Sequence, residues 1–171
     1  MWTTRTRPTS SARARVTGPT SRTAQRDNPL VEFSYRLTGT GWSEARIAND
    51  KCSTVLTASY LSDALGDLLA AVCDLLDGAG ATGCTWQEEP GEYRWSLARH
   101  GEYVAVRVQD LVLREGAVVF DALVPLRDFA TAIASGAELV LDEHGETGYR
   151  ERWVEHPFPV EALAAVRDRL D

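Results

Sequence analysis

Four short strand-like segments follow one another between residues 84 and 124, the first three with apolar residues at every second position, and this pattern constrains the fold most. Only short turns separate the segments; in Arg99–Glu102, His100 and Gly101 stand where a tight hairpin needs positive φ. A period of two is typical of strands that bury one face. Strands joined by short turns pair antiparallel. The sequence therefore predicts a four-stranded meander whose inward side chains include Cys84, Trp86, Tyr93, Trp95, Leu97, Val104, Val106 and Val108.

Three further strands are predicted before this meander. Residues 31–37 alternate between branched or aromatic and polar side chains, and residues 38–41 form a glycine-containing turn. Residues 42–47 then supply the return strand of a hairpin, and residues 52–57 supply a third, short strand. The chain thus begins its folded part near Leu30.

Helical periodicity appears in three places. Residues 59–77 carry six leucines and one valine on one helical face, with Ser59 or Ser62 as the expected N-cap and Gly78 as the stop. A second helix is predicted from Pro125 to Gly145, and a short third helix follows Pro159. Residues 146–156 fit either an extended or a helical conformation.

The order of these elements defines the fold class. We expect an α+β domain, with an antiparallel β-sheet of about six or seven strands and two or three helices packed on one face. About 140 folded residues are enough to bury a substantial core without metals or disulfides.

Charge is distributed unevenly along the chain. The formal net charge is −7, yet residues 1–28 hold six arginines and a single acidic residue, Asp27. We interpret residues 1–28 as a disordered arm rich in arginine, serine and threonine, and residues 29–171 as a single acidic domain. An arm that binds nucleic acid or an anionic surface is the alternative. Nucleic-acid binding by the domain itself is disfavoured, because the domain would repel phosphates.

Membrane, cofactor and disulfide functions are not expected. No stretch approaches 18 consecutive apolar residues. Cys52, Cys73 and Cys84 are odd in number, and their spacing fits neither a zinc ribbon nor a redox pair. We expect them to be small buried residues in a reducing compartment, which points to the cytoplasm. His144, among acidic neighbours, is interpreted as a residue of a helix C-terminus, and no metal site or cofactor is predicted.

An acidic stripe on the helix at residues 59–77 is the strongest candidate site. Asp63, Asp67, Asp74 and Asp77 fall within about 80° on a helical wheel. No lysine or arginine occurs from residue 59 to residue 77, so no counter-charge stands at i+4. A solvated helix face explains such a stripe in most proteins. The functional alternative is a surface that attracts a basic partner.

Enzymatic function has weaker support. The chain has no nucleophile elbow, and a catalytic site would have to be assembled from Tyr93, Glu89, Glu92, His144 and His156. The glutamates surround a hairpin tip, where solvated loop charges are the ordinary interpretation.

Three functional hypotheses follow. The favoured one is a non-catalytic protein-binding module with an acidic face, similar in kind to an immunity or antitoxin protein that inhibits a basic protein. The alternatives are an enzyme with a site of scattered residues and a structural domain that forms a homodimer through an open sheet face.

Overall fold

The computed structural model describes residues 31–112 and 116–171, so the predicted arm at residues 1–28 lies outside the described residues. Within them the chain forms seven strands and three helices, which confirms the α+β class. The strands are β1 (Glu32–Gly39), β2 (Trp42–Ala48), β3 (Ser53–Ser59), β4 (Ala81–Glu88), β5 (Gly91–His100), β6 (Tyr103–Asp110) and β7 (Ala117–Pro125). The helices are α1 (Ala64–Leu76), α2 (Leu126–Trp153) and α3 (Val160–Leu170).

The strands are divided between two antiparallel sheets, where the sequence suggested one. β1, β2 and β3 form the first sheet, and β4 to β7 form the second in chain order. The break falls where α1 joins β3 to β4. Alternation predicts which face of a strand is buried, but it carries no information on pairing across a helical connection.

The predicted meander is confirmed. β5 pairs with β6 from Tyr93–Asp110 to His100–Tyr103, and Gly101 in the connecting turn has φ +64°. The prediction of a positive φ at His100 is wrong, because His100 is the last residue of β5. Glycine adopts this left-handed conformation without the steric cost that a Cβ would add. The turn thus sets the register that places Trp95 opposite Val108 on the buried face.

α1 begins later than the apolar periodicity suggested. Ser59 ends β3, and the N-cap is Asp63, whose Oδ1 accepts a hydrogen bond from the Gly66 amide at 3.3 Å. The expectation that Ser59 or Ser62 caps the helix is therefore wrong. The Ser62 hydroxyl instead accepts a hydrogen bond from the Gln87 amide of β4, at 3.0 Å.

α2 changes direction at Gly145, where φ is 63° and ψ is 173°. The predicted stop at Gly145 is thus a break within a longer element, and helical structure resumes to Trp153. This second segment carries Tyr149 and Trp153 into the core, where both are fully buried. Burial of two large aromatic side chains resolves the ambiguity of residues 146–153 in favour of a helix.

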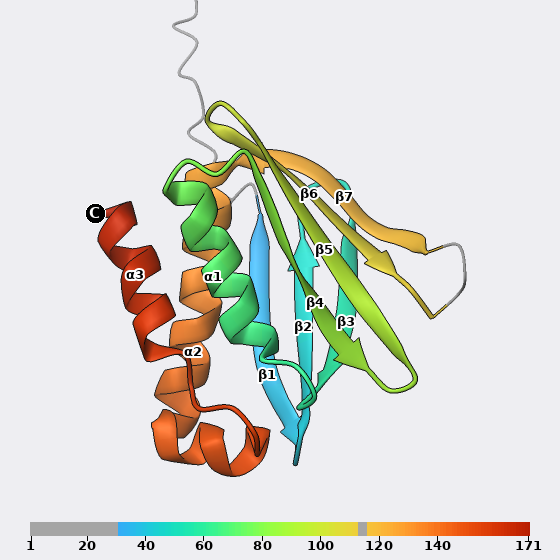
Figure 1. Cartoon of the computed structure of the whole chain (residues 1–171), viewed down its shortest axis with the longest axis vertical. Coiled ribbons are helices and arrows are strands. Elements are labelled where there is room, and N and C mark those ends of the chain that lie inside the picture. Colours follow the sequence, from blue (N-terminus) through green and yellow to red (C-terminus); the bar gives the residue numbers. More distant parts are fainter. Residues whose placement is uncertain (1–30, 113–115) are drawn as a thin grey trace, which may run out of the picture.

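The helices gather on one side of the strands (Figure 1). α2 packs on β1, α1 packs on β4, and α3 packs against both other helices. The Tyr35 ring meets the Trp86 ring edge-on at a centroid distance of 6.0 Å and lies 6.4 Å from the Trp153 ring. This aromatic cluster joins the two sheets to α2 and lies beneath the start of α1.

Candidate functional site

The neighbouring helices α1 and α3 both expose several carboxylates to solvent. The only exposed base among the described residues of the two helices is Arg169. We call this set the acidic helical surface; it consists of Asp67, Asp74 and Asp77 near α1 and Glu161, Asp168 and Asp171 near α3. The exposed acids of α3 thus add to those that the α1 sequence predicts.

The four predicted aspartates occupy two ends of α1. Asp63 and Asp67 lie at its start, while Asp74 and Asp77 lie near its end. Asp63 is half-buried and is engaged in capping the helix, whereas Asp67, Asp74 and Asp77 are exposed. Asp63 is thus more a structural residue of the helix start than a member of the exposed surface.

Burial changes the acidity of the first two aspartates. Desolvation raises the pKa of Asp63, although the Gly66 amide and the nearby His156 partly oppose this effect. Desolvation also raises the pKa of Asp67, and the charge of Asp63 adds to the increase. Two neighbouring carboxylates at a partly buried helix start therefore resist ionisation.

We expect Asp63→Asn to raise the melting temperature at pH 7. Asparagine caps a helix about as well as aspartate, and it removes a partly buried charge. Because the folded state raises the pKa of Asp63, it binds the proton more tightly than the unfolded state does. The charge penalty is therefore absent below the unfolded pKa of about 3.9 and develops as pH rises through the folded-state pKa. Thermal unfolding between pH 3 and pH 7 measures this dependence.

Asp74→Asn is the matched control, since it makes the same charge change at an exposed position of the same helix. Its effect on the melting temperature at pH 7 should be the smaller of the two. A lower melting temperature for Asp63→Asn at pH 7, or an effect independent of pH, would contradict the role assigned to Asp63.

Asp77 has a counter-charge that the sequence pattern of α1 did not reveal. Arg169 of α3 donates from Nε and Nη2 to the two carboxylate oxygens of Asp77, at 2.6 and 2.7 Å. This hydrogen bonding lowers the pKa of Asp77. The prediction of an uncompensated stripe is therefore wrong at Asp77, because the partner arrives from 92 residues further along the chain.

The five residues of the enzyme hypothesis have separate environments. Tyr93 is buried, and burial reinforced by the neighbouring charge of Glu88 raises its pKa to about 12. Glu89 is exposed in the β4–β5 turn, and Glu92 accepts a hydrogen bond from Gln87 at 3.1 Å. His144 approaches only its chain neighbour Glu143 closely enough for a charge contact among the described residues, and His156 precedes α3.

The cysteines are unpaired thiols, each half-buried. Burial raises the pKa of Cys84 to about 12 and also raises that of Cys73. A raised pKa lowers the thiolate fraction that nucleophilic attack requires. No three histidine, cysteine or acidic side chains within residues 31–112 and 116–171 are grouped to hold a metal ion.

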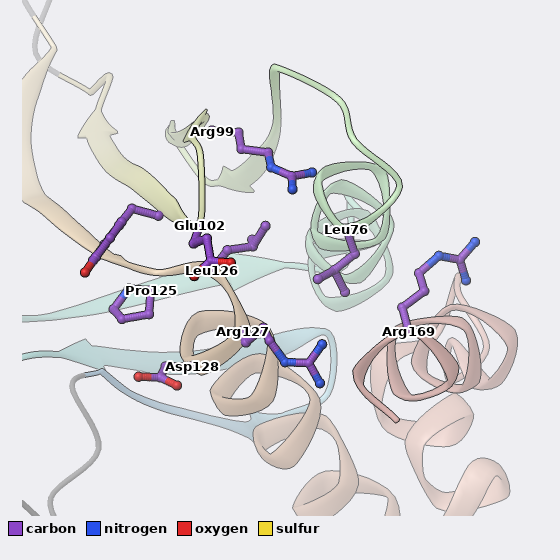
Figure 2. Close-up of a pocket in the computed structure, with 9 residues that line it drawn as sticks. Leu76, Arg99, Glu102, Pro125, Leu126, Arg127, Asp128 and Arg169 are labelled. Atoms are coloured by element: carbon purple, nitrogen blue, oxygen red, sulfur yellow. The ribbon is translucent and has the colours of Figure 1, made fainter.

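A pocket of about 420 Å³ lies where α1 and α3 end and α2 begins (Figure 2). We call it the arginine pocket, because the side chains of Arg99, Arg127 and Arg169 line it. Sequence analysis missed this site, since Arg99 belongs to a hairpin and Arg127 to a helix start. The remaining residues that line it are Leu76, Glu102, Tyr103, Pro125, Leu126 and Asp128.

Comparison with known proteins found no matching family model, curated protein or solved structure. Among the helices that the structure describes, none combines the length and apolar character needed to cross a membrane.

Proposed function

We propose that this protein is a non-catalytic binding module that presents the acidic helical surface to a basic protein. The specific form we favour is an inhibitor of the immunity or antitoxin type, which would cover the basic site of a partner such as a nuclease. Three unpaired cysteines fit a role in a reducing compartment such as the cytoplasm.

The observation that carries this proposal is the contrast between the helices and the sheets. Four of the six carboxylates on the described strands are paired with arginines, as in the contact of Arg36 with Glu44 at 2.6 Å and that of Arg107 with Asp121 at 2.7 Å. Among the described residues, Asp67 and Asp74 of the acidic helical surface have no such ion pair. Unpaired surface carboxylates attract a positively charged partner and accelerate its association.

The environment of the enzyme candidates also favours binding over catalysis. Tyr93 lies in β5, His144 lies in α2, and His156 lies between α2 and α3. General acid–base catalysis requires such groups within hydrogen-bonding reach of one reacting atom.

We expect the double substitution Asp67→Asn with Asp74→Asn to weaken partner binding about tenfold at low salt. Each exposed charge pair contributes up to about 1 kcal/mol, and about 1.4 kcal/mol corresponds to a factor of ten. The experiment is capture from native lysate at low and high salt, identification of the retained basic protein, and calorimetric titration of that purified partner with each variant. Binding should weaken as salt is added.

The control is Asp50→Asn with Glu89→Gln, which changes the net charge equally at exposed positions of two sheet loops. The control should leave the affinity within about twofold of wild type at equal ionic strength. If both double variants weaken binding equally, the effect is one of net charge and not of the helical position. If the α1 variant has no effect, the acidic helical surface is not part of the interface.

A further inference from the structure

Two arginines of the arginine pocket lack a carboxylate partner among the described residues. Arg99 donates from Nε to the Gly101 carbonyl at 3.0 Å and from Nη1 to the Leu75 carbonyl at 2.9 Å. Arg127 donates from Nη2 to the Leu170 carbonyl. A guanidinium has five N–H donors, so both side chains keep donors free for a further acceptor.

The third arginine contrasts with these two. Arg169 forms two hydrogen bonds with Asp77, so the Asp77 carboxylate neutralises its charge. Arg99 and Arg127 have backbone carbonyls as acceptors, and a carbonyl does not neutralise a full positive charge. The pocket therefore holds two guanidinium charges whose counter-ion is not supplied by these contacts.

Two acidic residues, Glu102 and Asp128, also line the pocket, and neither forms an ion pair with Arg99 or Arg127 among the described residues. Figure 2 shows the Arg127 side chain directed toward the ends of α1 and α3, while the Asp128 carboxylate lies on the other side of the first turn of α2. The backbone carbonyl of Glu102 accepts the Leu126 amide at 2.9 Å. The positive end of the α2 dipole adds to the charge of the arginines, although it would not form a site alone.

Apolar side chains form the rest of the wall. Leu76, Pro125 and Leu126 line the pocket together with the half-exposed ring of Tyr103. A volume of about 420 Å³ falls in the range of small-molecule sites. A second pocket of about 320 Å³ also has Tyr103 and Pro125 in its lining. This combination suits a molecule with one anionic end and an apolar or aromatic body.

We propose that the arginine pocket binds a small organic phosphate. The phosphate would accept hydrogen bonds from Arg99 and Arg127, and the organic body would lie against Leu76 and Tyr103. Guanidinium forks match the oxygen geometry of phosphate and can engage two oxygens at once. This site lies apart from Asp67 and Asp74, so its test does not depend on the proposed protein partner.

The test uses the full chain and four probes: phenyl phosphate, inorganic phosphate, phenol and benzoate. Phenyl phosphate should bind saturably and more tightly than either fragment, as followed by calorimetry and by amide chemical shifts. Arg127→Gln should weaken its binding at least about tenfold, since a charge-assisted hydrogen bond is among the stronger polar contacts. Arg94→Gln, at an exposed arginine of β5 paired with Glu92, should leave the affinity within about twofold.

Each other outcome overturns part or all of the proposal. Absence of saturable phenyl phosphate binding at about 10 mM would overturn it entirely. Equal affinity for inorganic phosphate would overturn the claim that the pocket binds the organic body of the ligand. Tighter binding of benzoate than of phenyl phosphate would overturn the choice of phosphate as the anion. Arg99→Gln is a second variant with the same expected loss; if circular dichroism shows that it does not fold, Arg127→Gln decides the outcome.

Discussion

Replacing Trp86 by alanine is expected to lower the free energy of unfolding by about 3–5 kcal/mol. The Trp86 side chain is fully buried, and its ring contacts Trp95 at a centroid distance of 5.1 Å and Tyr35 at 6.0 Å. Truncation would leave a cavity between the two sheets, since the ring of Trp86 in β4 contacts Tyr35 in β1. Urea unfolding followed by circular dichroism and by fluorescence measures the loss.

Trp42→Ala is the matched control, because Trp42 lies in β2 and is only partly buried. It should cost less than half as much as Trp86→Ala. Similar losses for the two variants, or a loss below about 1 kcal/mol for Trp86→Ala, would mean that Trp86 does not hold the two sheets together.

Gly83→Ala is expected to cost about 2 kcal/mol, the second-largest effect we predict. A Cβ at Gly83 would lie 2.2 Å from the backbone carbonyl oxygen of Trp95 on the neighbouring strand β5. A backbone atom in a paired strand cannot move aside as a flexible side chain can. The β4–β5 ladder must therefore distort, which denaturant unfolding and amide exchange in β4 would both detect.

Gly80→Ala provides the comparison within the same chain segment, since a Cβ there meets no atom within 4 Å. It should be neutral, or should stabilise by up to about 1 kcal/mol through the lower entropy of the unfolded chain. If Gly83→Ala proves as harmless as Gly80→Ala, the close approach of β4 to Trp95 is not a constraint on the fold.

Local pattern was sufficient to predict most of the elements. Alternation at Tyr93, Trp95 and Leu97 indicated both the strand and its buried face, and β5 confirms both. The leucine and valine face predicted α1, whose end near Gly78 agrees with the sequence. These patterns can be recognised in the sequence because each depends on residues that are close together along the chain, within one helical turn or one pair of neighbouring strands.

The division into two sheets and the course of α2 depended on contacts distant in sequence. A glycine at residue 145 is the usual mark of a helix end, and its conformation there is indeed non-helical. Helical structure resumes because Tyr149 and Trp153 meet the aromatic cluster around Tyr35. Residues 146–153 alone do not indicate that two of their side chains pack against this cluster.

The candidate sites show the same limit. The sequence named Asp67, Asp74 and Asp77 because helical spacing is a local property. Helical spacing does not indicate that Asp77 pairs with Arg169. It also does not indicate that Arg99 and Arg127 line the same pocket. Both arrangements arise only when a hairpin, two helix ends and a helix start come together.

α3 is anchored more weakly than α1, and this difference has a consequence for both sites. Only Leu163 and Val166 of α3 are buried, whereas eight residues of α1 are. Local opening of α3 therefore needs less free energy than opening of α1. Each opening event would release Asp77 from Arg169 and Arg127 from the Leu170 carbonyl at once. The same fluctuation would thus leave the negative charge of Asp77 unpaired and free a donor of Arg127 for an anion, so one local equilibrium would affect both charged sites.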